Sequence, residues 1–97
     1  MIRRVVLDVI IPKKGPSIVE IAESLSKVDG VDAVNITVKE IDMETENIIV
    51  VVEGNSINFK ELYNIIEEIG GVVHSIDQVV AGKRVAEVPK EIIEEQL

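Results

Sequence analysis

The chain has 97 residues, a net charge of −8 and no cysteine. This length suits one small domain, and the lack of cysteine excludes disulfides, thiol catalysis and thiolate metal sites. The acidic charge argues against nucleic-acid binding, because phosphate backbones repel an acidic surface. Asp8 interrupts the first apolar run, and no run approaches the length of a membrane span. We therefore expect a cytoplasmic protein that binds neither nucleic acid nor membrane.

The N-terminal part of the chain predicts a strand followed by a helix. An apolar, β-branched run over Ile2–Ile11 is typical of a strand, and Pro12 ends it. Ser17 and Glu20 have the spacing of a capping box, which predicts the start of a helix. Apolar side chains then recur at helical spacing until Gly30, a residue suited to the left-handed conformation that ends helices.

The middle of the chain predicts a hairpin and a second helix. Polar and apolar residues alternate over Ala33–Ile41, as in a strand with one buried face. A polar turn, Asp42–Asn47, leads to an apolar strand over Ile48–Val52. Asn58 opens the second helix with another cap signature, and the pair Gly70–Gly71 ends it.

The last elements complete a recognisable order. Val72–Ala81 predicts a strand, and Pro89–Leu97 predicts a short terminal helix with Pro in its first turn. The order is that of an α+β, ferredoxin-like βαββαβ two-layer sandwich with a four-stranded antiparallel sheet. We expect a ferredoxin-like domain over residues 1–84. Residues 85–97, here called the tail, should be helical and packed on the sheet or on a partner subunit.

The two central strands predict self-association. In this fold both helices cover one sheet face, yet the first strand and Ile48–Val52 are apolar on both faces. Val6, Ile10 and one alternate set from Ile48–Val52 should therefore point away from the helices, and such a patch is unusual on a monomer. A second copy is the simplest cover, so a homo-oligomer is predicted. The alternative is a monomer whose amphipathic tail covers its own sheet (Val85, Val88, Ile92, Ile93, Leu97).

Carboxylates in the hairpin turn form the first candidate site. Asp42, Glu44 and Glu46 alternate with other residues, and hard cations such as calcium prefer several oxygen ligands at close range. We therefore consider a divalent-cation site, with calcium as the expected ion, that copies of the chain could share. The alternative is a solvated acidic hairpin tip.

Asp8 is the second candidate, because its phase on the first strand points it to the face without helices. A carboxylate buried in an assembly must find partners or lose its charge. The neighbouring last strand offers two sets. Ser75 and Asp77 join Asp8 if Ile76 points to the core, whereas His74 joins it if Ile76 points outward. Either cluster could bind a metal or polar ligand, and the alternative is a satisfied structural contact.

Two further features carry weaker signals. His74 is the only histidine, so a histidine-rich zinc site is excluded, and no nucleophile motif accompanies it. The loop from Pro12 to Ser17 combines glycine and two lysines with a helix N-terminus, which favours an anion, but it lacks a phosphate-loop pattern. We therefore expect no enzyme activity.

Several stretches resemble an uncharacterised archaeal family, the domain of unknown function family 211. The resemblance covers about Ile2 to Lys83, and the last of its blocks is the most specific (Val6–Val9, Pro16–Ile18, Val34–Asp42, Thr45–Glu46, Gly70–Lys83). It implies a ferredoxin-like fold, an archaeal cytoplasmic setting, ring-like homo-oligomers and an association with a divalent cation, calcium among them. It implies no established activity.

Three functions follow as hypotheses. The leading one is a non-enzymatic homo-oligomeric module, regulatory in role, that binds a divalent cation or another small ligand. The second is a metabolite sensor similar to ACT domains, since the loop Gly15–Ile18 is similar in position to their glycine loop. The third is an enzyme with an active site at subunit junctions, for which only Asp8 and His74 are available.

Overall fold

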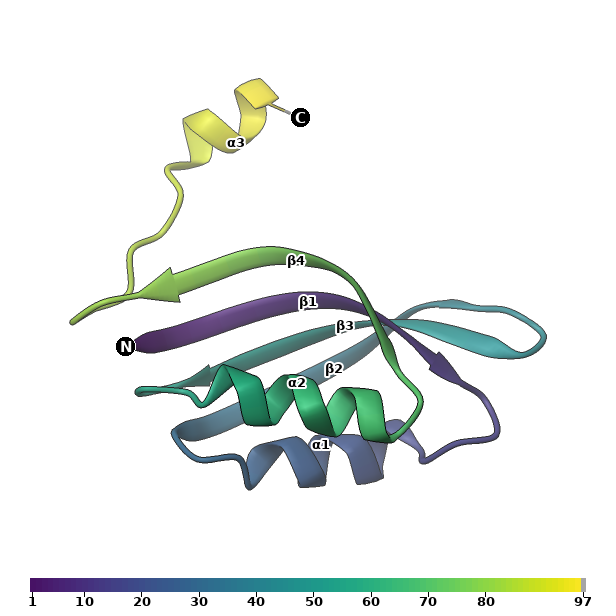
Figure 1. Cartoon of the computed structure of the whole chain (residues 1–97). Helices are drawn as coiled ribbons and strands as arrows, with labels where there is room; N and C mark the ends of the chain where they lie inside the picture. Colours follow the sequence, from purple (N-terminus) through teal and green to yellow (C-terminus); the bar gives the residue numbers. More distant parts are fainter. Residues whose placement is uncertain (97) are drawn as a thin grey trace.

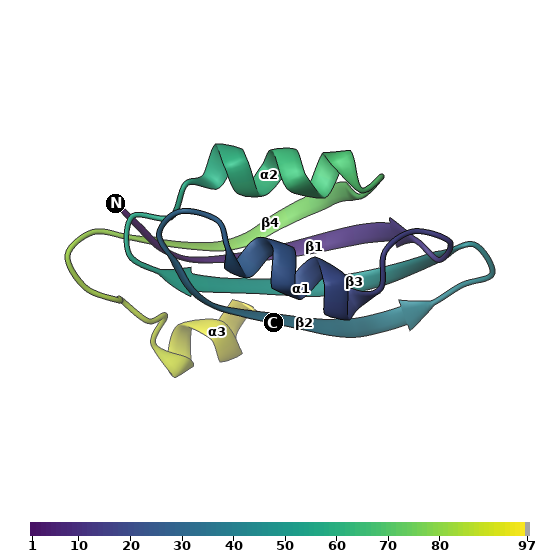
Figure 2. The same ribbon diagram turned by 90° about the horizontal axis from the view of Figure 1, so that it is seen from below.

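The computed structural model describes residues 1–96 and the side chains of residues 1–93. Its elements are β1 (Ile2–Pro12), α1 (Ile18–Ser26), β2 (Val31–Ile41), β3 (Thr45–Gly54), α2 (Phe59–Glu68), β4 (Val72–Ala81) and α3 (Lys90–Gln96). The strands form one antiparallel sheet in the order β2-β3-β1-β4. Helices α1 and α2 lie side by side on one face of it (Figure 1; Figure 2). The predicted α+β, ferredoxin-like βαββαβ sandwich is confirmed.

Both core helices begin at the predicted caps. The Ser17 hydroxyl accepts the backbone N–H of Glu20 at 3.3 Å, and the Asn58 side chain accepts that of Glu61 at 3.1 Å. Each bond satisfies an amide that a helix start would leave without a partner. Gly30 has a φ of +85° just before β2, the left-handed conformation expected of it. No helix within residues 1–96 is long and apolar enough to cross a membrane.

The hydrophobic core lies between the sheet and these two helices. Alternate residues of the central strands face it and are almost fully buried (Val5, Leu7, Val9, Ile11, Ile48, Val50, Val52). Leu25 of α1 and Leu62 of α2 are both 0% exposed and cover them. Every second residue of the central strands and one face of each helix are buried, and together these side chains form one contiguous core. The alternation and the helical spacing in the sequence predict this arrangement.

The hairpin is tighter than the sequence predicts. We expected a polar turn over Asp42–Asn47, but β3 begins at Thr45 and the turn is confined to residues 42–44. The backbone N–H of Asp42 donates to the carbonyl of Thr45 at 2.9 Å, and the Asp42 carboxylate accepts the N–H of Met43 at 2.9 Å. Pairing with β1 and β2 extends β3 into the polar stretch, because register outweighs the low strand propensity of these residues.

The tail leaves the sheet on the side opposite α1 and α2 (Figure 1). Its helix α3 follows Pro89, whose carbonyl accepts the N–H of Ile92 at 3.0 Å. Within residues 1–96, α3 lies along no strand and along neither of the other helices. The predicted helix is therefore present, and Leu97, which we included in its apolar stripe, lies outside the described residues. Packing of the tail on a sheet or a partner stays a prediction.

Candidate functional site

The sheet has a second face that neither α1 nor α2 covers, and we call it the open face. The central part of the open face comes from alternate residues of β1 and β3 that are paired in register (Arg4 with Glu53, Val6 with Val51, Asp8 with Ile49, Ile10 with Asn47). Its four apolar side chains, Val6, Ile10, Ile49 and Val51, are half-buried. The prediction that Val6 and Ile10 point away from the helices is confirmed, and the alternate set of β3 is Ile49 and Val51.

Asp8 lies in the middle of the open face and is only 7% exposed. Its carboxylate accepts a hydrogen bond from the Asn47 side-chain amide, and the ammonium of Lys39 lies 3.6 Å from its other oxygen. The same Asn47 amide donates to the carbonyl of Val9 at 3.1 Å. A carboxylate placed among apolar neighbours thus keeps both a donor and a counter-charge, which offsets the cost of its desolvation.

The register of β4 against β1 determines which β4 side chains lie beside Asp8. This register shifts between Val6 and Leu7 and again between Asp8 and Val9, and these irregularities break the strand alternation. Ile76 pairs with Leu7 of the core face, and Ser75 pairs with Asp8. The Ser75 hydroxyl, however, donates to Asp77 at 2.7 Å. Ser75 therefore lies beside Asp8 as in the first predicted arrangement, although Ile76 is 52% exposed and Asp77 has no partner on β1.

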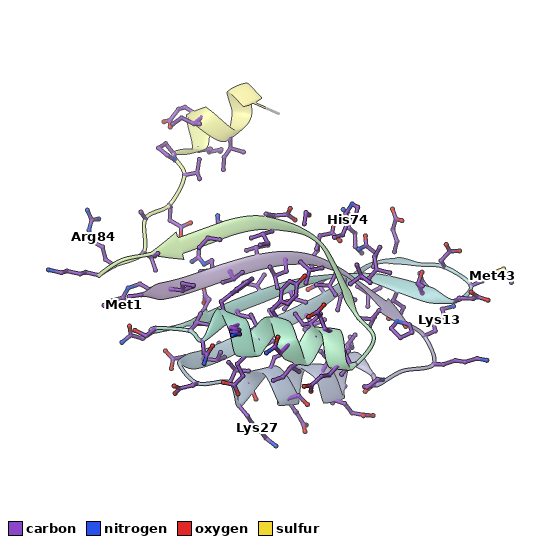
Figure 3. All side chains as sticks on the ribbon, viewed as in Figure 1. Met1, Lys13, Lys27, Met43, His74 and Arg84 are labelled. Atoms are coloured by element: carbon purple, nitrogen blue, oxygen red, sulfur yellow. The ribbon has the colours of Figure 1, made fainter. Side chains whose placement is uncertain are left out.

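His74 and Asp77 occupy the positions that these shifts leave without a β1 partner. Both side chains are exposed, and Figure 3 shows His74 on the side of β4 away from α1 and α2. No contact joins either of them to Asp8 among the hydrogen bonds and ion pairs described for that carboxylate. Bulges that re-aim single side chains leave no local sequence signature here, which is why the phase of β4 stayed open.

The three carboxylates of the acidic turn point into different surroundings. Asp42 lines a shallow concavity of about 450 Å³ on the open face, together with Ile10 and Asn47. Glu46 lines a different one beside the loop after β1, and Glu44 lines a third with Lys13. Among the described side chains, no group of three or more His, Cys, Asp or Glu lies close enough to hold a metal ion. A cation site on Asp42, Glu44, Glu46, Asp8, Asp77 and His74 would thus need ligands from another copy or from the backbone.

Arg4 is a site residue that sequence reasoning missed. Its guanidinium donates to Glu53 at 2.8 Å, to Glu87 of the tail at 2.6 Å and to Gln78 of β4 at 3.3 Å. Hydrogen bonds to Glu87 and then to Glu53 raise the pKa of Arg4 above its ordinary value. Its alternation with Val6 and Asp8 placed it on the open face, but its partners depend on register and on the path of the tail.

The loop after β1 forms the other concavity of note. It encloses about 500 Å³ and is lined by Lys13, Gly15 and Ser17 together with Glu46. The N–H of Lys13 donates to the carbonyl of Glu44 at 2.9 Å, which ties this loop to the hairpin turn. Lys13 and Met43 consequently lie at the same end of the molecule (Figure 3). The concavity therefore combines the ammonium group of Lys13, the carboxylate of Glu46 and the start of helix α1.

Comparison with known proteins agrees with the resemblance noted in the sequence. The model of the domain of unknown function family 211, described as "Uncharacterized ArCR", matches residues 3–95. An uncharacterised protein of Methanocaldococcus jannaschii is 52% identical over 86 residues, which cover 89% of this chain and 88% of that protein. The family match spans the sheet, the two core helices and most of the tail. The chain therefore belongs to the archaeal domain of unknown function family 211.

Proposed function

We propose that the chain is a non-enzymatic cytoplasmic module that assembles with copies of itself through the open face. It would hold a divalent cation or another small ligand where copies meet and act in regulation. The observation that carries this proposal is the half-buried apolar surface around the buried carboxylate of Asp8. Contiguous apolar side chains in the centre of an uncovered sheet face suit a surface that becomes buried on association.

Approximate free energies show how much the open face can contribute to assembly. At most about a third of each of the side chains Val6, Ile10, Ile49 and Val51 is still exposed, so covering them would stabilise an assembly by no more than roughly 2–4 kcal/mol, taking a third of about 1.5–3 kcal/mol for each. Association costs about 4–15 kcal/mol in lost rigid-body freedom. The open face therefore supports assembly without sufficing for it, and a second apolar surface must join it.

The local chemistry of Asp8 supports a binding role over a catalytic one. A general base needs a free acceptor within reach of a substrate proton. The carboxylate of Asp8 is instead occupied by Asn47 and Lys39. His74 lies apart from it in a bulge, so the residues suggested for an enzyme do not form a donor–acceptor pair.

A cation would act between copies. Each copy carries a net charge of −8, so their approach is opposed by repulsion that a bound cation reduces. Asp42 and Glu44 are exposed at the hairpin turn and can supply hard oxygen ligands. Because one copy gathers no complete ligand set among its described side chains, binding and assembly should be linked.

Sedimentation and native mass spectrometry of the full chain test the proposal, each with millimolar calcium and with chelator. We expect an oligomer at micromolar concentration that calcium tightens and chelator loosens. A monomer under both conditions would overturn the proposal. If the oligomer responds neither to calcium nor to chelator, the proposed cation binding is wrong and the proposed self-assembly still holds.

A metabolite sensor similar to ACT domains is the second candidate. The concavity at Lys13, Gly15 and Ser17 favours it, because a cation beside a helix start suits a small carboxylate ligand. Thermal melting in the presence of single free amino acids distinguishes the two functions. A rise in melting temperature that Lys13→Gln abolishes would support the sensor, whereas no rise with any amino acid would exclude this class of ligand.

A further inference from the structure

The sheet of this chain is complete before the tail begins. The N–H of Gly82 donates to the carbonyl of Met1 at 2.8 Å, and the Arg3 side chain donates to the carbonyl of Gly82 at 2.6 Å. These contacts fasten the end of β4 to the start of β1. The one ion pair described between the tail and the sheet is that of Glu87 with Arg4, on the open face.

The tail presents an apolar surface of its own. Four of its large apolar side chains are 42–45% exposed, namely Val85, Val88, Ile92 and Ile93. Helix α3 stands clear of the sheet on the same side as the open face (Figure 1). A single copy therefore leaves two apolar surfaces uncovered, one on the sheet and one on the tail.

We infer that the tail of one copy packs its apolar side chains onto the open face of a neighbouring copy. This inference rests on the proposed self-assembly and names the segment that is exchanged. Glu87 marks the point where the tail leaves its own sheet, because its pairing with Arg4 fixes the tail only three residues before α3. The open face alone falls short of what association costs, and the tail supplies the second apolar surface in comparable amount.

Charge also favours this occupant. Lys39, whose side chain is 53% exposed, is a basic group at the β2 side of the open face. Helix α3 opens with Lys90, carries Glu91 in its first turn and has no basic residue in its last turn. A tail docked on a neighbouring open face would bring carboxylate and ammonium groups to the same interface, where opposite charges steer association.

The first test compares the full-length wild type with Ile92→Ser/Ile93→Ser by sedimentation over a concentration series. We expect the double variant to weaken assembly about 100-fold, roughly tenfold for each lost apolar side chain. Val19→Ser/Val79→Ser is the matched control, since Val19 is 64% and Val79 54% exposed and neither lies on the open face or the tail. The control should assemble as the wild type does, and circular dichroism should show an intact fold in all three proteins.

The second test asks whether the tail acts between copies. Val6→Ser/Ile49→Ser weakens the open face but keeps the tail, whereas the Ile92/Ile93 variant keeps the open face. Mixed together, they can form one intact tail–face contact, so native mass spectrometry should detect a 1:1 mixed pair that neither variant forms alone.

Three results separate the possible errors. A monomeric wild type would overturn the proposed self-assembly itself. A tail variant that assembles like the wild type would overturn the tail exchange and leave self-assembly intact, provided that the open-face variant is impaired. A tail variant that is monomeric but yields no mixed pair would also overturn the exchange, because the tail would then act within its own copy.

Discussion

Val6 and Leu7 are neighbours in β1, yet they belong to two surfaces with different tasks. Leu7 is 0% exposed beneath the helices, and Val5, Val9 and Ile11 on the same face of β1 are also apolar and nearly fully buried. Val6 is half-buried on the open face, where apolar residues alternate with Arg4, Asp8 and Asn47. A surface that is apolar but carries satisfied charges and remains partly exposed differs from a core. Because the two faces of β1 differ in this way, substitutions on the open face should change assembly and substitutions on the core face should change stability.

The largest expected effect is on the open face. Val6→Asp would place an unpaired carboxylate in the proposed interface, which should cost about 3–5 kcal/mol of association energy, or more than about 100-fold in the dissociation constant. Secondary structure should survive, because Val6 lies outside the core cluster. Sedimentation and circular dichroism on the same sample check both statements. If Val6→Asp lost its helical circular dichroism signal as well as its assembly, the open face and the core face would not be independent.

The matched change on the core face is Leu7→Ala. It should lower the free energy of unfolding by about 2–5 kcal/mol, because it leaves a cavity among fully buried side chains. Denaturant unfolding measured at a fixed protein concentration tests this. The assembly of the remaining folded protein should keep its wild-type copy number, and a changed copy number would mean that the two faces are coupled.

A smaller effect is expected at Asp8. Asp8→Ala removes the acceptor of the Asn47 amide and the counter-charge of Lys39, which should cost about 1–3 kcal/mol of stability. Asp8→Asn is the control, since it keeps an acceptor of the same shape, and it should cost less than Asp8→Ala. Thermal melting ranks the two variants. Equal losses would indicate that the charge, and not the hydrogen bond, holds this site together.

The smallest effect is expected from Glu87→Gln. It removes one of two carboxylates on Arg4, and Glu53 remains to pair with the guanidinium. The melting temperature should barely change, whereas the backbone of Val88 should become more mobile in nuclear magnetic relaxation. Glu91→Gln is the control, because Glu91 follows the Arg4–Glu87 ion pair in the chain and takes no part in it. Unchanged relaxation at Val88 would show that the ion pair does not hold the tail.

The sequence predicts those features that depend on local pattern. Alternation in β1 correctly orients Val6 and Asp8, and the cap residues Ser17 and Asn58 correctly start both core helices. These signals are strong because a shift of one residue would move every side chain to the wrong face.

The remaining features depend on contacts between distant segments. The bulges of β4 separate His74 and Asp77 from Asp8, and nothing in their own sequence marks them. The Arg4 cluster joins residues up to 83 positions apart, so it requires both the strand register and the path of the tail. The early start of β3 has the same cause, since pairing on both sides carries the strand through a polar stretch. Local propensity cannot contain such information.

The position of β1 has a consequence for synthesis. It is synthesised before the other three strands of the sheet, yet it lies inside the sheet between β3 and β4. One of its edges stays unpaired until Thr45–Gly54 has emerged, and the other until Val72–Ala81 has emerged. A nascent chain therefore exposes an apolar strand until both of its partners have emerged, and unpaired strand edges promote aggregation. Arg3, Arg4 and Asp8 place charges within that strand, and charges within an unpaired apolar strand oppose misassociation.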